Sequence, residues 1–320
     1  MKKFNNSVFK FAIFIFGFFN VLFIYSNVNS QTSDNPNKLF DDGLTVLVFG
    51  DWGREGIKIQ QDVANQMGIF ALANNVQFLV VVGDNFYDDG VTGLDDPHWT
   101  RSFEAVYTAP SLQVPWYVML GNHDYRGNIH AQIQYSAISN RWKMPSRYFS
   151  NTAKINDTTE ALFVFMDSSP FVQSYYTRKS MKNVVGVDTL AQLRWADSVL
   201  ANSNAKYKIV AAHHPVFSYG EHGQTKELIT QWKPMLERNN VDLYLAGHEH
   251  DLQYLYPPDG SVHYFVSGAG SETRPTTSGE YTKFAKGKTG GFLLLNFTDK
   301  IKAAFVDHSG NVLYQTEITD

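Results

Sequence analysis

Cysteine is absent from all 320 residues of the sequence. Its absence excludes a cysteine nucleophile, a thiolate zinc site, an iron–sulfur cluster, a disulfide bond and a lipid-modified cysteine anchor. Any metal ion that the protein binds must therefore be held by histidine, carboxylate, amide or phenolate side chains.

Positive charge is also scarce, because 27 lysines and arginines face 31 acidic residues and the formal net charge is −4. Lys2, Lys3 and Lys10 are the only charged residues among the first thirty, so the chain without its first thirty residues has a formal charge of −7. An acidic protein is a poor non-specific binder of nucleic acid. We therefore expect no nucleic-acid partner.

The longest apolar run is shorter than a membrane span. It covers Phe11–Tyr25, is interrupted by Asn20, follows two lysines and is followed by small residues. This is the pattern of a secretory signal peptide, whereas spanning a bilayer takes about 20 apolar residues. We predict a signal peptide over 1–30, cleavage near Ser30 and Gln31, and a periplasmic or secreted protein without membrane contact afterwards. A retained anchor is the alternative.

The rest of the chain has the features of a globular protein. The sequence is 43% hydrophobic and 15% aromatic, and it is long enough to bury a full core. No repeat, low-complexity tract or long charge run follows Leu44. We predict a linker over 31–43 and a single domain over 44–320.

Apolar segments of strand length alternate with longer amphipathic stretches, which is an α/β pattern. The predicted central strands are Leu44–Phe49, Phe78–Val82, Trp116–Leu120, Ala161–Met166, Tyr207–Ala212 and Val241–Ala246. The predicted helices are Ile57–Ala73, Thr189–Ala201 and Thr225–Asn239. Four further strands, expected to form a second sheet packed on the first, are Val262–Ser267, Phe292–Phe297, Lys302–Val306 and Val312–Glu317. Residues 168–187 show no clear period and are predicted as a surface loop.

Five of the six predicted central strands end in a polar cluster. The clusters are Gly50–Gly53, Gly83–Tyr87, Gly121–Asp124, His213–Pro215 and Gly247–His250. One Gly-Asp pair after a strand is ordinarily a turn. Five clusters at the carboxyl ends of strands, where open α/β sheets bind ligands, indicate a functional site instead.

The side chains of these clusters suit a binuclear metal centre, because first-row metal ions accept carboxylates, imidazoles and amide oxygens. Asp84 is predicted to bridge the two metals. The remaining predicted ligands are Asp51, Tyr87 and His250 for one metal, and Asn122, His213 and His248 for the other. An extended His248-Glu249-His250 segment would send both imidazoles to one side and Glu249 away.

The motifs Asp-x-Gly, Gly-Asp-x-x-Tyr, Gly-Asn-His-Asp, His-x-Pro and Gly-His-x-His, in this order, resemble the metallophosphoesterases and specifically the purple acid phosphatases. The resemblance covers about Leu44 to Ile318. It implies an α/β fold, a metallophosphoesterase-like sandwich of two packed mixed β-sheets flanked by helices. Most metallophosphoesterases have a histidine at the position of Gly53, and here Tyr87 replaces that imidazole.

Further segments resemble the small, tartrate-resistant enzymes of mammals. These are the runs from Val210 to Ser218 and from Gly247 to Leu255. The animal enzymes carry cysteines near the position of Asp167–Pro170, and this chain has none. Their protease-regulated loop is therefore not assumed here.

The resemblance implies a binuclear acid phosphatase that hydrolyses phosphate monoesters by attack of a metal-bound hydroxide. Because phenolate favours a hard trivalent ion, the Tyr87 site should hold Fe(III), beside a divalent Fe, Zn or Mn. His123 is predicted to protonate the leaving group, and the resemblance adds His222 with Glu221 as a second candidate. Small phosphomonoesters or phosphoproteins are the expected substrates, and a monomer is expected.

Other interpretations stay open. The same metals could cleave phosphodiesters, or the protein could bind phosphoryl ligands without turnover or act as a membrane-tethered structural protein. His123 could instead bond Asp124, and for His214 a structural role is predicted. The aromatic residues beside the ligands, Trp52, Phe86 and Tyr125, are predicted to pack rather than to contact substrate.

Overall fold

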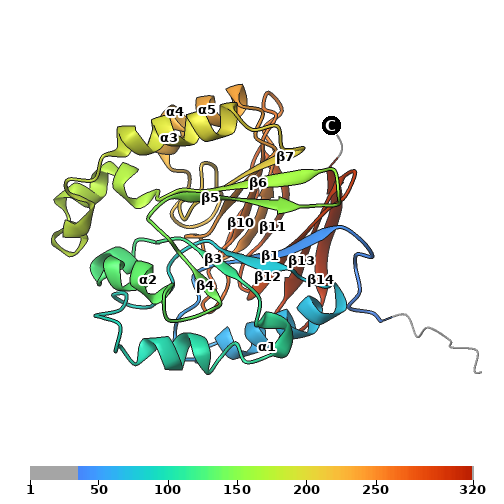
Figure 1. Cartoon of the computed structure of the whole chain (residues 1–320), viewed down its shortest axis with the longest axis horizontal. Coiled ribbons are helices and arrows are strands. Elements are labelled where there is room, and N and C mark those ends of the chain that lie inside the picture. Colours follow the sequence, from blue (N-terminus) through green and yellow to red (C-terminus); the bar gives the residue numbers. More distant parts are fainter. Residues whose placement is uncertain (1–34, 319–320) are drawn as a thin grey trace, which may run out of the picture. The chain divides into compact units, whose positions relative to one another are not determined.

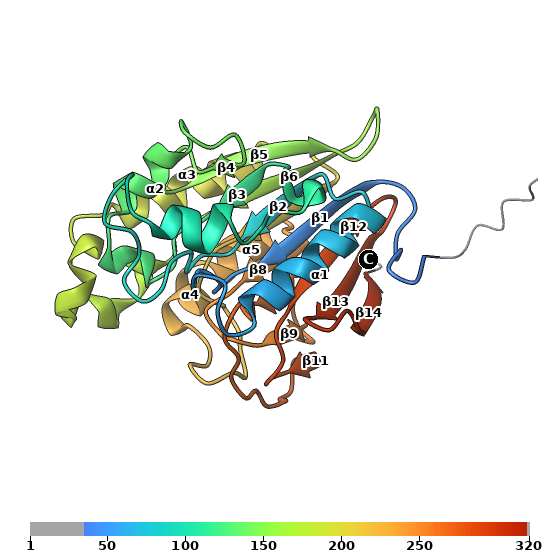
Figure 2. The same ribbon diagram turned by 90° about the horizontal axis from the view of Figure 1, so that it is seen from below.

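Two β-sheets pack face to face at the centre of the molecule, with helices on their outer faces (Figures 1 and 2). The computed structural model describes residues 35–318, so the predicted signal peptide lies outside the described residues. From Asn35 onward these residues form one compact unit. Within the described range, no helix has the length and apolar character that crossing a membrane requires.

The first sheet has seven strands in the order β14-β13-β12-β1-β2-β3-β4. Their bounds are β1 Leu44–Phe49, β2 Phe78–Val81, β3 Trp116–Val118, β4 Trp142–Lys143, β12 Gly291–Phe297, β13 Ile301–Asp307 and β14 Val312–Ile318. Strands β1 to β4 run parallel, and β12 joins β1 in the antiparallel sense with Leu47 opposite Leu294.

The second sheet also has seven strands, in the order β11-β9-β10-β8-β7-β6-β5. Their bounds are β5 Phe149–Lys154, β6 Glu160–Phe165, β7 Tyr207–Ala211, β8 Leu243–Ala246, β9 Leu252–Leu255, β10 His263–Ser267 and β11 Thr282–Lys286. Strands β6, β7, β8 and β10 are parallel neighbours. The expected sandwich of two mixed sheets is therefore confirmed.

The predicted division of the strands between the sheets is wrong. The last quarter of the chain does not form its own sheet, because β12 to β14 extend the sheet of β1 while β10 and β11 extend that of β6 to β8. The six predicted central strands are likewise split, three to each sheet. Apolar periodicity identifies a strand but not its hydrogen-bonding partner, which depends on contacts far apart in sequence.

In the described residues, five α-helices, one π-helix and five 3₁₀-helices connect the strands. The α-helices are α1 Gln60–Ala73, α2 Ile129–Tyr135, α3 Thr189–Ala201, α4 Lys226–Gln231 and α5 Lys233–Arg238. The π-helix is η1 Trp99–Glu104, and the 3₁₀-helices are η2 Pro110–Leu112, η3 Asp124–Arg126, η4 Ser169–Phe171, η5 Gln173–Thr177 and η6 Lys179–Val184. The predicted helix Thr225–Asn239 is divided at Trp232, because Pro234 has no backbone N–H and occupies the first turn of α5.

Two segments expected to be irregular are packed against the fold. The predicted loop 168–187 contains η4, η5 and η6, and its Met181 and Val184 side chains are buried. In the predicted linker, Phe40 is buried and the Asn74 side chain accepts hydrogen bonds from the backbone N–H groups of Leu39 (2.6 Å) and Phe40 (3.0 Å).

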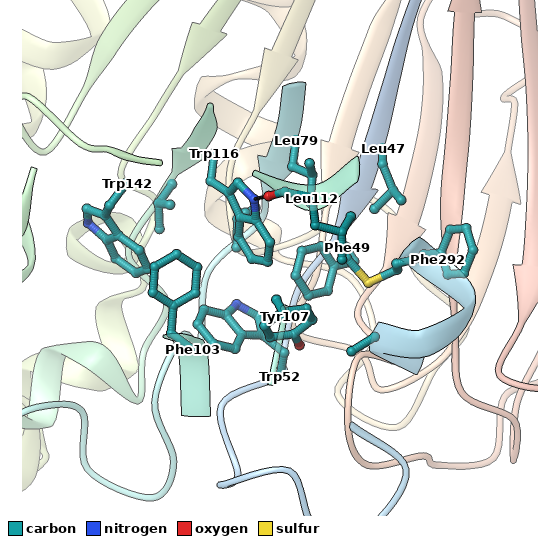
Figure 3. Packing of buried hydrophobic residues seen from close by; sticks show 14 of the residues in the cluster. Leu47, Phe49, Trp52, Leu79, Phe103, Tyr107, Leu112, Trp116, Trp142 and Phe292 are labelled. Atoms are coloured by element: carbon teal, nitrogen blue, oxygen red, sulfur yellow. Dashed lines mark hydrogen bonds between the residues drawn. The ribbon is translucent and has the colours of Figure 1, made fainter. Parts of the chain in front are cut away.

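A cluster of large aromatic rings supports the turn after β1 (Figure 3). Trp52 is fully buried and lies 6.0 Å from Phe49 and 5.5 Å from Tyr107, measured between ring centroids. Phe86 and Tyr125 are also fully buried. The predicted packing role of these three aromatic residues is confirmed, and Trp52 holds the residue before it, Asp51, at the end of β1.

Candidate metal centre

The carboxyl ends of five strands, β1, β2 and β3 from one sheet and β7 and β8 from the other, meet at one place. The turns that follow these strands bring together seven side chains, here named the ligand cluster: Asp51, Asp84, Tyr87, Asn122, His213, His248 and His250. All but His248 are buried.

Asp84 lies between two groups of the ligand cluster. Its Oδ2 is 3.0 Å from the Tyr87 hydroxyl, and its Oδ1 is 3.5 Å from Nε2 of His213. One carboxylate therefore faces both groups with different oxygens, which is the arrangement that a bridging ligand requires.

Tyr87 is the centre of the first group. Its hydroxyl lies 3.0 Å from Oδ1 of Asp51, 3.0 Å from Oδ2 of Asp84 and 3.2 Å from Nε2 of His250. One phenol hydrogen cannot serve two carboxylates and an imidazole, so lone pairs face one another here. Electron-pair donors crowded in this way fit a metal ion.

His213 is the centre of the second group. Its Nδ1 donates to the backbone carbonyl of Val82 at 2.8 Å, which leaves the Nε2 lone pair facing Nδ1 of His248 and Oδ1 of Asn122, each at 3.2 Å. A backbone carbonyl on the far nitrogen is a common way to orient a metal-binding imidazole.

His248 and His250 reach different groups, but not for the predicted reason. His248 has a left-handed backbone with φ 69°, so the segment is not extended. Glu249 is fully buried, and its carboxylate accepts hydrogen bonds from the N–H groups of His222 (3.1 Å) and Gly223 (2.7 Å). Glu249 therefore anchors the loop that contains His222 and Gly223, a role that the sequence analysis missed.

Close backbone packing explains why two glycines belong to the motifs. A Cβ atom at Gly53 would lie 1.8 Å from the Asn85 carbonyl oxygen, and one at Gly121 would lie 2.1 Å from Oδ1 of Asp84. The backbone that leads to Tyr87 thus occupies the space that a side chain at position 53 would need. The tyrosine and the glycine are two parts of one local structure.

Without a bound cation, the surroundings of the ligand cluster disfavour the negative charges of Asp51 and Tyr87. Burial and the neighbouring Asp84 carboxylate raise the pKa of Asp51 well above its usual value, and burial and Asp51 likewise raise the pKa of Tyr87. Burial also opposes ionisation of Asp84, but His213 and His123 outweigh it and lower the pKa of Asp84 to about 2. A bound cation would favour all three anions, so the donor set fits metal ions.

Burial favours the neutral form of the three imidazoles of the cluster, which is the form that binds metal ions. Burial lowers the pKa of His213, lowers that of His248 well below its usual value, and together with the Arg274 charge lowers that of His250 to about 3.

Donor atoms of His213, His214 and His248 also lie within 4.8 Å of one another. Both ring nitrogens of His214 are engaged, however, with Ser168 (2.8 Å) and Tyr175 (2.7 Å). The geometry gives His214 a structural role.

The chain is similar in sequence to known phosphoesterases. Residues 44–252 match the model of the calcineurin-like phosphoesterase family. Purple acid phosphatase 7 of Arabidopsis thaliana is 36% identical to this chain over 317 residues, which cover 94% of each protein. The chain belongs to the purple acid phosphatase family. The rabbit (Oryctolagus cuniculus) tartrate-resistant acid phosphatase type 5 is 35% identical over 299 residues, covering 86% of this chain and 90% of the relative.

A solved structure shares the fold over most of its length. It is GAP50, the anchor in the inner membrane complex of Plasmodium, and it matches with a TM-score of 0.76 and 25% identity over 87% of this chain and 89% of that chain. That protein is described as an anchor. A shared fold therefore does not by itself establish the chemistry of the site. The purple acid phosphatase family implies a binuclear metal centre, and the ligand cluster has the donors for one.

A cavity of about 470 Å³ opens over the ligand cluster. His123 lines it and follows the ligand Asn122. Its Nδ1 bonds the backbone carbonyl of Asp88 at 2.5 Å, and its Nε2 lies 3.9 Å from Oδ2 of Asp84. The alternative in which His123 bonds Asp124 is not found. The Asp124 carboxylate instead accepts the N–H groups of Gly121 (2.8 Å) and Asn85 (3.1 Å) and holds two ligand-bearing turns together.

His222 also lines the cavity, but its acidic partner is not the expected one. Its Nδ1 lies 3.3 Å from Oε2 of Glu249, and its Nε2 lies 3.1 Å from a guanidinium nitrogen of Arg274. Glu221 instead lies 3.7 Å from Arg274 and is not among the residues that line the cavity. A role for Glu221 stays a prediction that rests on resemblance alone.

A buried acid behind the site makes stability depend on pH. Burial raises the pKa of Asp167 to about 7, and its carboxyl group accepts the Tyr125 hydroxyl. The folded state thus holds a proton that the unfolded state loses near pH 4. The contribution to stability is complete below that pH and is lost as the pH rises through about 7, at most about 4 kcal/mol.

We expect Asp167→Asn to remove this pH dependence, because asparagine stays neutral. Relative to the unchanged protein, the variant should gain stability between pH 4.5 and 7.5. Urea unfolding at both pH values measures the change, with the exposed Asp157→Asn as the control. If the unfolding free energies of the variant and the unchanged protein differed by the same amount at both pH values, the buried-proton explanation would be contradicted.

Proposed function

We propose that this protein hydrolyses phosphate monoesters as a metal-dependent acid phosphatase with a binuclear centre. The observation that carries the proposal is the convergence of seven metal-binding side chains below one cavity, centred on an aspartate that faces both groups. The matching relatives are named purple acid phosphatases and tartrate-resistant acid phosphatase, which agrees with this chemistry. Release of phosphate from p-nitrophenyl phosphate at acid pH by the metal-loaded protein tests it.

The ligand cluster divides into two metal sites. Asp51, Tyr87 and His250 would hold one ion, Asn122, His213 and His248 the other, and Asp84 both. Two metal ions in such a centre supply a hydroxide nucleophile from water near or below neutral pH and neutralise phosphoryl oxygens. Because the ligands include only three potential anions, a trivalent and a divalent ion together keep a net positive charge that attracts phosphate.

We further propose Fe(III) for the Tyr87 site and a divalent Fe, Zn or Mn for the other. A buried phenolate between two carboxylates is a hard, anionic donor, which favours a trivalent ion. Two imidazoles and an amide suit several divalent ions, so availability decides among those. Phenolate-to-iron charge transfer would give the protein a visible colour.

His123 is the proposed proton donor to the leaving group. The Asp88 carbonyl holds Nδ1 of the ring, so Nε2, 3.9 Å from Oδ2 of Asp84, is the nitrogen left for proton transfer. The ring lies 4.3 Å from that of Tyr87, measured between centroids, which keeps it beside the ligand cluster without being part of it. A proton on Nε2 can pass to the departing alkoxide oxygen.

For His123→Ala we expect turnover to fall about 10²-fold or more on alkyl phosphates, since general acid catalysis contributes about 10²–10⁴-fold. On p-nitrophenyl phosphate the loss should be much smaller, because nitrophenolate leaves without a proton. Metal content should stay unchanged. His222→Ala is the matched comparison, and a larger leaving-group dependence in that variant would assign the proton transfer to His222.

Two other functions have distinct outcomes in the same assays. Faster hydrolysis of bis(p-nitrophenyl) phosphate than of the monoester would make the protein a phosphodiesterase. The fold match to a protein described as an anchor favours a test for the non-catalytic alternative. Full metal loading without turnover of either ester would support that alternative.

Substrate and location belong to the same proposal. Small phosphomonoesters or phosphoproteins are the proposed substrates of a monomer. Export is proposed from the leader 1–30, and the amino terminus of the mature protein tests it. A mature chain that begins at Gln31 would support export with cleavage.

A further inference from the structure

The cavity above the ligand cluster is larger than one phosphoryl group requires. Its volume of about 470 Å³ falls in the range of about 300–1,000 Å³ in which proteins bind drug-sized molecules. The walls therefore contact parts of the substrate beyond the scissile phosphate, and their chemistry indicates what those parts are.

The walls are strongly cationic. Apart from Asp84, the charged side chains that line the cavity are four cations and a single acid; they are Arg126, Arg178, Lys226, Arg274 and Glu227. The chain as a whole has a net negative charge of −4. A local excess of positive charge in an acidic protein is an electrostatic signal for an anionic ligand.

Among the described residues, three of these cations come from separate segments and have a single acidic partner at ion-pair distance between them. Within the described part of the chain, no acidic side chain lies at ion-pair distance from Arg178 or Lys226. Arg126 has one acidic contact, 3.6 Å from Asp89, and its Nε is buried without a hydrogen-bond partner among the described residues. Unused guanidinium donors are suited to phosphate oxygens.

The segment that carries Arg178 is held in place by several contacts. The Tyr175 hydroxyl bonds Nε2 of His214 at 2.7 Å, and the backbone N–H of Gln173 donates to Glu227 at 2.9 Å. The Arg178 guanidinium lies over the Tyr175 ring, 4.9 Å from its centroid. Glu227, the single acid of the wall, is therefore used to hold this segment.

Arg126 and Arg178 belong to segments that are tied to each other. The Asn183 side chain donates to the backbone carbonyls of Tyr125 (2.8 Å) and Gly127 (3.0 Å), on either side of Arg126. Lys226 begins α4 beside Glu227. Hydrogen bonds between their segments thus link the three cations, all of which line the cavity.

We propose that Arg126, Arg178 and Lys226 form a second anion-binding subsite, and that the preferred substrates are small phosphomonoesters with a second phosphate group. One phosphate occupies the ligand cluster while the other binds the three cations. This inference rests on the proposed phosphatase function for its substrates, but the subsite itself can be tested by binding alone.

The kinetic test compares fructose 1,6-bisphosphate with fructose 6-phosphate. We expect the unchanged protein to favour the bisphosphate at least tenfold in kcat/KM. Having two phosphates that can be hydrolysed would by itself raise kcat/KM only about twofold. In the double variant Arg178→Gln/Lys226→Gln this preference should fall to about twofold. The control Lys179→Gln/Lys233→Gln removes the same charge outside the cavity and should keep the preference.

The binding test uses pentane-1,5-diyl bisphosphonate and pentylphosphonate, measured by calorimetry on the metal-loaded protein. Carbon–phosphorus bonds are not hydrolysed, so binding is measured even if the protein hydrolyses no ester and the proposed function fails. We expect the bisphosphonate to bind at least tenfold tighter, and the double variant to lose that advantage. Equal affinities in the unchanged protein, or an equal loss in the control, would overturn the subsite.

Discussion

Asp84→Asn is expected to reduce turnover by more than about 10³-fold and to lower the metal content below two ions per chain. Asp84 is the residue whose two carboxylate oxygens face the two groups of the ligand cluster, at 3.0 Å from Tyr87 and 3.5 Å from His213. An amide can offer one oxygen but no negative charge to hold a pair of cations together.

Metal analysis and phosphatase kinetics on the purified variant measure both effects. Asp95→Asn, at an exposed position, is the matched control and should behave like the unchanged protein. The variant's folding is checked by thermal denaturation, because Oδ1 of Asp84 also accepts the backbone N–H of His123 at 2.8 Å. Full metal content with near-normal turnover would show that the bridging position lies elsewhere.

Tyr87→Phe is expected to remove almost all of the visible absorption of the iron-loaded protein. The substitution deletes only the hydroxyl, which is the atom that lies within 3.2 Å of Asp51, Asp84 and His250. Without phenolate there is no phenolate-to-iron charge transfer. The aromatic ring remains, so its cation–π contact with Arg54, 3.8 Å from the centroid, and the local packing are kept.

An absorption spectrum recorded with iron analysis distinguishes loss of the chromophore from loss of the metal. Tyr107→Phe is the control, because that phenol is also buried but lies in the aromatic core, where its hydroxyl accepts from Gln60 at 3.3 Å. A Tyr87→Phe protein that keeps both iron and colour would move the iron-binding phenolate to another residue. A protein that is colourless before any substitution would remove the iron assignment while leaving a two-metal phosphatase possible.

The strands near the ligands could be predicted well from sequence. Runs such as Leu44–Phe49, apolar except for Thr45, favour burial, and β1 has these bounds in the structure. The helix Thr189–Ala201 also agrees with α3, since Asp188 caps it by accepting the N–H of Ala191 at 2.9 Å. The strands β4, β5, β9 and β11 were missed, because such segments depend on their neighbours rather than on local pattern.

The roles of the residues around the ligands were harder to predict. His222 lies beside Glu221 in sequence, yet the acid that contacts it is Glu249, 27 positions away. Likewise, Asp124 follows His123, but its carboxylate holds the Asn85 and Gly121 turns rather than the imidazole. Adjacent residues on a tight turn point in different directions, so sequence neighbours are a poor guide to contacts.

The sequence by itself determined which donors are present and in which order, because each ligand follows a strand and metal chemistry restricts the residue types. Family membership could be inferred from the same motifs. Only the tertiary structure decided how the strands divide between two sheets, which oxygens of Asp84 face which group, and that Arg126, Arg178 and Lys226 share a cavity. These features depend on chain segments far apart in sequence, and their contacts form only when the two sheets pack together.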